Sequence, residues 1–431
     1  MISYNEALVC IRAAARSKIL EFSKSTNLLS VEPGEVQNLM NRIASEDLVS
    51  LESIPSFDNS SMDGFALRSE WTAHASDGHP VILQILGTTY AGDSKSVELK
   101  SKQASCIEIM TGAPMPEGAD AVVKIEDVTR VGQAILIKAP LHANENVRAK
   151  STDFHPGQRL LRAGARISSE HILGLATVGI AQVRVKKKPK IALVSTGNEL
   201  VSKISDAISG GMIRNSTAPY LMSAFPLLGA EGIHYGLVKD DAESFKTMIQ
   251  KILKNQPDVI ITTGAVSKGK LDFVPDAFRD LGAEVKFHGV AIKPGKPLLF
   301  AEFKDGPAVF AVPGNPISTA VALRFFINPY LQALQGMPDE VTEPARLKGT
   351  TEKAQGLTCF WKAVVETKLE GTQVTSLVGQ ESYRVSSLMP ANAWIIFSES
   401  GEEVKDGSVV QTLPLYPKLI FESENHKGEC C

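Results

Sequence analysis

The sequence predicts a multidomain protein of mixed α/β and β structure. Strand, loop and helix patterns alternate between Lys188 and Leu331, and short apolar runs with turn residues occupy the regions on either side. The chain has 431 residues, 43% of them hydrophobic, which is enough to bury several cores. At roughly 150 residues per domain, this length corresponds to two to four domains.

The N-terminal part is predicted to be helical first and then β. One helical stretch begins at Tyr4, and a second runs from Glu32 to Ile43. From Ser50 to about Asn146 the pattern changes to short apolar runs separated by Gly, Pro and Asp, namely VILQIL, SCIEIM, DAVVKI and AILIKA. These runs predict a small all-β domain. A linking segment and the helical stretch ILGLATVGI follow.

A parallel sheet covered by helices is predicted after Pro189. Its segments are, in order, KIALVS, TAPYLMSAFPLLG, DAESFKTMIQKILKN, DVIITT, FVPDAFRDLG, PLLFAEF, AVFAV and ISTAVALRFFINPYLQAL. Ligands of such sheets lie outside the carboxyl ends of the strands. The C-terminal residues return to short strands with Gly-rich turns and predict a second small β domain.

Charge and cysteine content exclude several classes of protein. The 45 basic and 48 acidic residues give a net charge of −3, so no overall field favours nucleic acid or a membrane surface. The five cysteines lack metal-ligand spacing and are odd in number, which favours a reducing, cytoplasmic compartment. We expect neither a signal peptide nor a membrane span. For Cys430 and Cys431, an exposed tail is favoured over lipidation.

Loops rich in glycine and lysine carry the chemistry of the predicted α/β domain. Gly provides close backbone approach, and consecutive amides near a helix start bind phosphate oxygens. A further loop from Lys293 to Pro297 adds two ammonium groups between prolines, which suits an oxyanion. An ordinary turn is the alternative for any single loop, but all are expected at one edge of the sheet. The three loops that follow strands are Thr196 to Glu199, Thr263 to Lys270 and Pro313 to Pro316.

The loop from Gly264 to Lys270 nearly matches the phosphate-binding P-loop pattern, with Gly269 before the lysine. Leu271 stands where that pattern has a hydroxyl residue that binds magnesium. A nucleotide hydrolase of the P-loop type is therefore disfavoured.

Carboxylates are expected near the same edge, at Glu199, Asp240, Asp241 and Asp272. Hard cations such as magnesium bind oxygen ligands and bridge carboxylates to substrate phosphates. Helix capping is an equal alternative for the pair Asp240 and Asp241, and it is also an alternative for Asp272. The polar turns at Pro55 to Ala66 and Met110 to Pro114 are explained equally well by turn chemistry.

Seven segments in a fixed order resemble the molybdopterin molybdenumtransferases, which comprise the bacterial MoeA-type proteins and the equivalent E domain of gephyrin. The resemblance covers nearly the whole chain. The segments are FDNSSMDGFA from Phe57, MTGAPMPEGADAVV from Met110, NVR with Asp153, STGNEL from Ser195, TGAVSKGKLDF from Thr263, AIKPGKP from Ala291 and VPGNPIS from Val312.

Family membership implies a particular architecture and reaction. The fold would be a three-layer α/β domain with a parallel-rich sheet, two small β domains and an elongated split α+β domain. Its parts would be residues 1–47 plus 146–180, 48–145, 181–332 and 333–431. The protein would be a homodimer with shared active sites, in contact with other proteins of molybdenum cofactor biosynthesis. It would convert adenylylated molybdopterin and molybdate into molybdenum cofactor, AMP and water, with Mg²⁺ or another divalent cation.

The resemblance also implies site residues. Glu199, Asp240 and Asp272 match metal and nucleotide positions, and Asp63, Thr111 and Asp153 match functional positions outside the α/β domain. The residues expected to bind cofactor or oxyanion are Gly197, Gly264, Ser267, Lys293, Lys296, Pro297, Ser318, Lys362 and Ser382. The residues expected to be catalytic are Asp63, Thr111, Asp153, Glu199, Asp240, Asp272 and Lys293. Lysines and hydroxyls suit a tetrahedral dianion such as molybdate.

This chain departs from the common family pattern at several positions. Gly289 replaces a frequent Lys, and Lys362 replaces an Arg, so anion binding is expected to be weaker because Arg binds oxyanions with a planar fork. Ala265 and Ser151 replace Gly, and Asn215 stands where Asp is common. Lys268 and Lys270 are additions that would restore positive charge. A catalytically weakened scaffold or cofactor-binding protein is therefore the alternative to the transferase.

Overall fold

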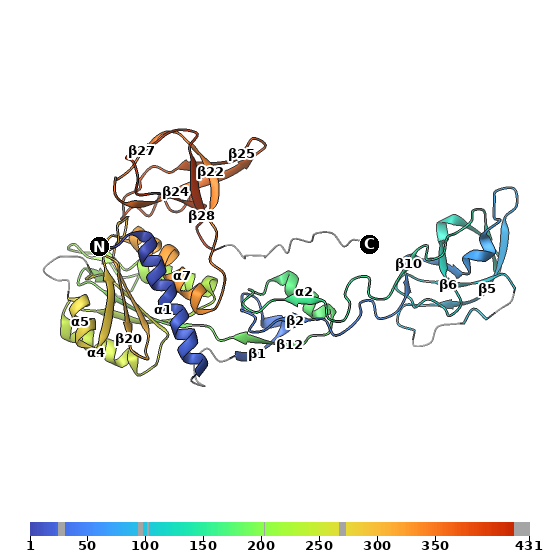
Figure 1. Ribbon diagram of the computed structural model, residues 1–431, viewed down its shortest axis with the longest axis horizontal. Coiled ribbons are helices and arrows are strands. Elements are labelled where there is room, and N and C mark those ends of the chain that lie inside the picture. Colours follow the sequence, from blue (N-terminus) through green and yellow to red (C-terminus); the bar gives the residue numbers. More distant parts are fainter. Residues whose placement is uncertain (25–30, 94–97, 101–102, 202, 267–272, 418–431) are drawn as a thin grey trace.

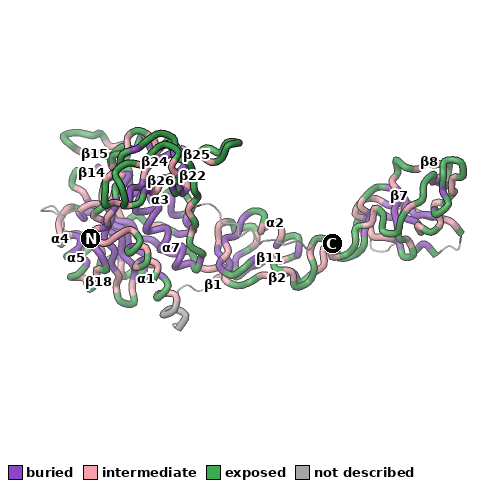
Figure 2. Tube along the Cα trace, turned by 45° about the horizontal axis from the view of Figure 1, so that its top comes forward, coloured by how far each residue is buried: buried purple, intermediate pink, exposed green. Residues whose placement is uncertain are grey.

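The computed structural model describes residues 1–24, 31–93, 98–100, 103–201, 203–266 and 273–417. The molecule is elongated (Figure 1). An α/β unit and a C-terminal β unit lie together at one end, and a separate β unit formed by residues 59–137 lies at the other. A narrow middle section connects them, and Figure 2 shows that buried residues gather in each of these parts.

The α/β unit contains a six-stranded, mostly parallel sheet in the order β16-β13-β17-β21-β20-β18. The first four strands are parallel, and β20 and β18 run antiparallel to them at one edge. This arrangement confirms the parallel-rich sheet that the sequence predicts. The bounds are β13 Lys190–Thr196, β16 Glu231–Val238, β17 Val259–Thr263, β18 Ala283–His288, β20 Leu299–Phe303 and β21 Ala308–Val312.

Helices cover both faces of this sheet and make three layers. Ile191 and Leu193 pack into one core, and the alternate residues Ala192 and Val194 pack into another, as period-2 strand geometry requires. The first core contains α3 (Thr217–Ala224) and a continuous helix made of α6 (Pro316–Ala322), a π-helical turn (Leu323–Ile327) and α7 (Asn328–Leu334). The second contains α4 (Ala242–Leu253) and α5 (Val274–Asp280).

The N-terminal helix α1 (Tyr4–Lys24) packs on the α/β unit. Ala7 and Ile11 are fully buried in the same core as Phe325 and Phe326. The ring of Tyr4 meets that of Phe326 edge-on, with 5.5 Å between centroids. The described side chains of this helix therefore pack with the α/β unit, which differs from the expected grouping of residues 1–47 with 146–180. Its small apolar face fits the α7 helix closely, and this pairing partner is not encoded in local periodicity.

The second expected helix, from Glu32 to Ile43, is wrong. The structure has β1 (Val31–Glu35) paired antiparallel with β12 (Gln182–Lys186), followed by a short 3₁₀ turn (Val36–Asn38). A side chain at Gly34 would lie 2.6 Å from Leu39, so the ladder depends on this glycine. Leu39 and Val36 pack in the core of the middle section with α2 (Ser169–Thr177), β2 (Leu48–Val49) and β11 (Arg159–Leu161), whereas Met40 is exposed.

The distant β unit contains a six-stranded sheet in the order β7-β4-β6-β5-β9-β8. It is joined to the middle section beside a short pairing of β3 (Asn59–Ser60) with β10 (Val147–Arg148). Its strands are β4 Gly64–Leu67, β5 Val81–Thr89, β6 Ser105–Ile109, β7 Ala121–Lys124, β8 Val128–Val131 and β9 Ala134–Ile137.

The C-terminal β unit is a six-stranded sheet that closes through a further pairing of β24 with β26. One of its strands is β19 (Ile292–Lys293), which comes from the α/β region and pairs in parallel with β24. The two units are thus joined by backbone hydrogen bonds next to the lysine loop. The other strands are β22 Glu343–Lys348, β24 Thr358–Lys368, β25 Gly371–Ser376, β26 Ala393–Phe397 and β28 Val409–Pro414. Within the described ranges, no helix has the length and apolar character needed to cross a membrane.

Candidate functional site

A cavity of about 920 Å³ lies at the carboxyl ends of the central parallel strands. The loops that follow β13, β17 and β21 all line it, as the strand order and direction predict. The lysine loop between β19 and β20 and a loop of the C-terminal unit complete the wall. The predicted residues that the structure brings together here are Gly197, Glu199, Asp240, Gly264, Lys293, Lys296, Pro297, Ser318 and Ser382.

Gly264 allows the loops after β13 and β17 to approach each other. It has φ of +97°, and a side chain there would lie 2.5 Å from the carbonyl oxygen of Thr196. Its amide donates to the carbonyl of Val312, at 3.0 Å, so it also fixes the loop after β21. The floor of the cavity is therefore built from backbone that only glycine can supply at this position.

Ala265 lies in the left-handed region, with φ of 49°. A residue with a Cβ costs roughly 1–2 kcal/mol in this conformation. We therefore expect Ala265→Gly to stabilise the folded protein by about 1 kcal/mol, measured by thermal unfolding. Gly264→Ala is the matched control and should destabilise, because its Cβ has no room. A loss of stability in Ala265→Gly would show that packing of the methyl group outweighs the backbone strain.

Lys293 and Lys296 place two exposed ammonium groups on one side of the cavity. Lys293 is fixed at its backbone because it is the last residue of β19, paired with Cys359 of β24. Between the two lysines, Gly295 has φ of +101°, and a side chain there would contact Ile292. Ser318, which is buried, contributes from the start of the 316–334 helix. Positive charge and helix-start amides on one side suit an oxyanion or phosphate.

Glu199 and Asp240 supply the negative side of the cavity. Asp240 Oδ2 accepts a hydrogen bond from the amide of Asn198 at 3.0 Å, and its own amide donates to Asn198 Oδ1 at 3.3 Å. Asp241 instead caps α4 through the amide of Ser244, at 2.7 Å, and this bond lowers the pKa of its carboxyl. The sequence left both a role in the site and helix capping open for these two residues. In the structure Asp240 faces the cavity and Asp241 caps the helix.

Several of the predicted site residues lie outside the part of the chain that the structure describes. Ser267, Lys268, Lys270 and Asp272 lie outside the described residues, as do Cys430 and Cys431. Within the part of the chain that is described, no three His, Cys, Asp or Glu side chains gather closely enough to hold a metal ion. The metal set of Glu199, Asp240 and Asp272 therefore stays a prediction.

The C-terminal unit contributes a wall that the sequence did not predict beyond Ser382. Gln380, Glu381 and Tyr383 line the cavity beside that serine. The carbonyl of Ser382 accepts a hydrogen bond of 2.9 Å from the amide of Ile317, so this loop is tied to the start of the 316–334 helix. Its residues carry no motif of their own, and their place in the site depends on how the two units dock. Arg214 also lines the cavity but is not among the residues predicted from the sequence. Its positive charge is the one sequence signal that points to an anion site.

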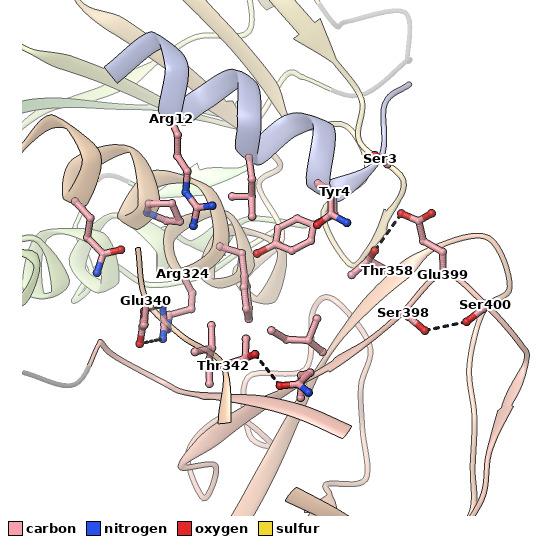
Figure 3. A pocket seen from close by; sticks show the side chains of 18 residues that line it. Ser3, Tyr4, Arg12, Arg324, Glu340, Thr342, Thr358, Ser398, Glu399 and Ser400 are labelled. Atoms are coloured by element: carbon pink, nitrogen blue, oxygen red, sulfur yellow. Dashed lines mark hydrogen bonds and ion pairs between the residues drawn. The ribbon is translucent and has the colours of Figure 1, made fainter. Parts of the chain in front are cut away.

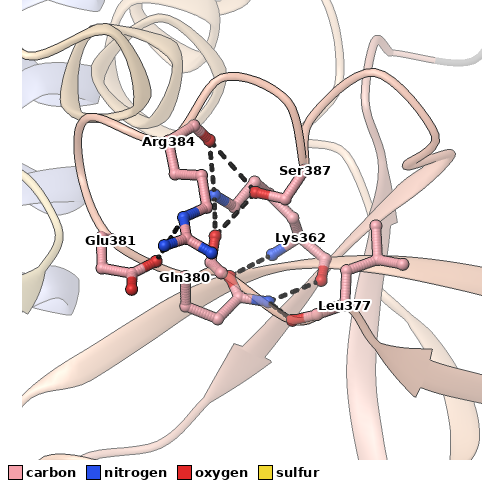
Figure 4. A network of polar contacts seen from close by, with 7 residues as sticks. Lys362, Leu377, Gln380, Glu381, Arg384 and Ser387 are labelled. Atoms are coloured by element: carbon pink, nitrogen blue, oxygen red, sulfur yellow. Dashed lines mark hydrogen bonds and ion pairs between the residues drawn. The ribbon is translucent and has the colours of Figure 1, made fainter.

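Lys362 does not line the cavity. It is fully buried on β24, and its ammonium donates to the backbone carbonyls of Gly379 and Arg384 (Figure 4). Burial lowers the pKa of Lys362 to about 8. In this structure it contacts the loop behind Ser382, which differs from the direct oxyanion contact implied by the resemblance.

Asp63, Thr111 and Asp153 lie away from the cavity of the same chain. Asp63 Oδ1 accepts hydrogen bonds from the amide of Thr111 at 2.7 Å and from its hydroxyl at 2.8 Å, and these bonds lower the pKa of the Asp63 carboxyl. This exposed pair belongs to the distant β unit at the opposite end of the molecule (Figure 1). Asp153 is exposed in the segment that leads from that unit back to the middle section.

A second cavity, of about 630 Å³, lies between α1, the 316–334 helix and the C-terminal unit (Figure 3). The charged groups that line it have partners within the protein, and Arg12 forms an ion pair with Asp339. Arg324 forms two hydrogen bonds to Glu340, at 2.7 and 2.8 Å, and Thr358 donates to Glu399. It contains none of the glycine or lysine loops, so we assign the chemistry to the first cavity.

Comparisons with known proteins identify the family. Residues 2–179 match the family profile described as MoeA N-terminal region (domain I and II), residues 192–333 the probable molybdopterin binding domain, and residues 344–415 the MoeA C-terminal region (domain IV). The chain is 36% identical to the molybdopterin molybdenumtransferase of Synechococcus elongatus, over 92% of this chain and 100% of that protein. It is 34% identical to the one from Bacillus subtilis, over 88% of both chains. The crystal structure of a molybdopterin biosynthesis MoeA protein from Pyrococcus horikoshii superposes with a TM-score of 0.79 at 27% identity, covering 96% of this chain and 99% of that one.

Proposed function

The chain belongs to the molybdopterin molybdenumtransferase family, and on that premise we propose that it inserts molybdate into adenylylated molybdopterin with release of AMP. The observation that carries this proposal is the charge arrangement of the first cavity. The cavity is lined both by the ammonium groups of Lys293 and Lys296 and by the carboxylates of Glu199 and Asp240. Such a site suits a substrate that combines a phosphoanhydride with a tetrahedral dianion.

The lysine side of the cavity would bind molybdate and the phosphates. Ammonium groups at Lys293 and Lys296 offset the charge that two anions bring together, and Ser318 and Ser382 supply hydroxyl donors. The close approach of the loops at Gly264 lets backbone reach the nucleotide phosphates. These residues then contribute to the transfer mainly in two ways. They reduce the repulsion between molybdate and the phosphates, and they orient the two substrates toward each other.

Glu199 and Asp240 fit a divalent cation, which we propose to be Mg²⁺. Both carboxylates line the cavity, and Mg²⁺ is commonly bound by one or two carboxylates together with substrate phosphates. When bound, the ion would polarise the phosphoanhydride. The hydrogen bond from the Asn198 amide to Asp240 Oδ2 holds the carboxylate in place before any ligand enters.

We propose that the functional protein is a homodimer with shared sites. The distance of Asp63, Thr111 and Asp153 from the cavity of their own chain supports this, because the same residues of a second subunit could face it. The functional division would be residues 1–47 plus 146–180, 48–145, 181–332 and 333–431, with α1 packed on the α/β part. We place the protein in the cytoplasm, and contact with other proteins of molybdenum cofactor biosynthesis is a further part of the proposal.

The test uses purified protein with adenylylated molybdopterin, Mg²⁺ and molybdate. We expect AMP release that requires molybdate and stops when a chelator removes the cation. Binding of the pterin without AMP release would instead indicate a scaffold. Hydrolysis of ATP in the absence of any pterin would indicate a nucleotide hydrolase and contradict the proposal.

A further inference from the structure

Lys362 is a buried lysine with two backbone acceptors. Its Nζ lies 2.7 Å from the carbonyl oxygen of Gly379 and 3.1 Å from that of Arg384 (Figure 4). These two carbonyls stand at either end of the short segment that carries Ser382. Lys362 therefore spans the base of the loop that forms one wall of the cavity.

Two neighbouring side chains complete the same network. Gln380 accepts from the amide of Lys362 at 3.0 Å and donates to the carbonyls of Lys362 and Leu377, at 2.9 and 2.7 Å. The hydroxyl of Ser387 lies within hydrogen-bonding distance of the same two carbonyls that Lys362 contacts, at 2.6 and 3.1 Å. The polar groups at the base of the loop are thus paired with one another, which favours a single loop conformation.

The same loop also lines the cavity. Gln380, Glu381, Ser382 and Tyr383 line the cavity, and the carbonyl of Ser382 accepts from the amide of Ile317. Any movement at the base would therefore move Ser382 relative to the lysine loop and release the start of the 316–334 helix.

We propose that Lys362 is a positioning residue that holds the loop from Gly379 to Arg384 against the cavity and so sets the place of Ser382. In this chain it acts on the bound oxyanion through the loop and does not touch it. The proposal rests on the proposed function in one respect, namely that the cavity binds an oxyanion.

Hydrogen-bond counting is consistent with this role. An ammonium has three donors and a neutral amine has two, and Lys362 has two carbonyl acceptors in this network. The charged groups that act on it are Glu381 and Arg384 of the same loop, and burial lowers its pKa from 10.5 to about 8. Between those pH values the unfolded chain binds more protons than the folded one, so the stability that depends on Lys362 rises as pH increases.

The test compares Lys362→Met and Ser387→Ala with Lys353→Met. Lys353 is the matched control because it is also buried in the C-terminal unit and donates to one carbonyl, that of Gly401, away from the cavity. Hydrogen exchange without ligand should become roughly tenfold faster at the Ile317 amide and across residues 377–388 in the first two variants. Lys353→Met should leave the Ile317 amide unchanged.

Molybdate affinity and pH dependence separate positioning from direct contact. We expect about tenfold weaker molybdate binding in both Lys362→Met and Ser387→Ala. The wild-type protein should gain thermal stability relative to Lys362→Met between about pH 8 and 10.5. Weaker molybdate binding in Lys362→Met with unchanged exchange would show a direct ligand and overturn the proposal. If wild-type protein fails to bind molybdate, the proposed function fails, whereas the exchange data still decide the role of Lys362.

Discussion

A Glu199→Ala chain mixed with an Asp63→Ala chain should recover about a quarter of wild-type activity, although each variant alone is nearly inactive. Random exchange of subunits makes about half of the dimers mixed, and one of the two sites in each mixed dimer is intact. Removal of either carboxylate alone should lower the turnover rate by roughly a hundredfold or more. Molybdate-dependent AMP release, measured after subunit exchange, checks this expectation.

The control for this experiment pairs Glu199→Ala with Asp240→Ala. Both residues line the cavity of their own chain, so a mixed dimer has one defective residue in each site and should gain nothing. Recovery in this control would show that the two residues do not act in the same site. Failure of the first mixture to recover activity, with dimers demonstrated, would contradict the shared site.

The double variant Lys293→Met with Lys296→Met should lose at least roughly a hundredfold in molybdate affinity, because each charge-assisted hydrogen bond contributes about 1.5–3 kcal/mol. Methionine keeps most of the side-chain volume and removes the charge. Both lysines are exposed, so the fold should be retained. Calorimetric titration with molybdate, with circular dichroism as the check on folding, measures the effect.

Lys251→Met is the matched control for the lysine pair, since Lys251 is an exposed lysine on the surface helix α4 and does not line the cavity. Its affinity for molybdate should equal that of the wild type. An unchanged affinity in the double variant would place the oxyanion elsewhere. The effect should also shrink at high salt, because exposed charges are screened.

Much of the α/β unit and its cavity could be predicted from the sequence. Strands such as β13 are buried on both faces, and their apolar runs end at glycine loops that must lie at one edge of a parallel sheet. The positions of Gly264 and Glu199 follow from that rule, whereas Lys293 is placed by the pairing of β19 with β24. The rule does not distinguish Asp240 from Asp241, because both follow β16. The sequence does not show which of the two carboxylates faces the cavity and which caps the helix.

Other features were decided by the tertiary structure. The stretch from Glu32 to Ile43 has helical spacing, yet its first residues pair with the backbone of β12 and Leu39 is buried in the core of the middle section. Hydrophobic periodicity predicts which residues are buried but does not predict which element they pack against. The packing of α1 on α7 could therefore not be predicted from the sequence either. For Lys362 the resemblance implied an anion ligand, but its hydrogen-bond partners are the backbone carbonyls of Gly379 and Arg384, in the segment between β25 and β26.

The sequence by itself therefore determined the family, the fold class and the strand-end residues of one cavity, since these depend on local pattern and chain order. The tertiary structure decided which carboxylate faces the ligand, which lysine supports the wall and how far Asp63 lies from the cavity of its own chain. These depend on contacts between residues distant in sequence, whose pairing is set by how separately folded units dock.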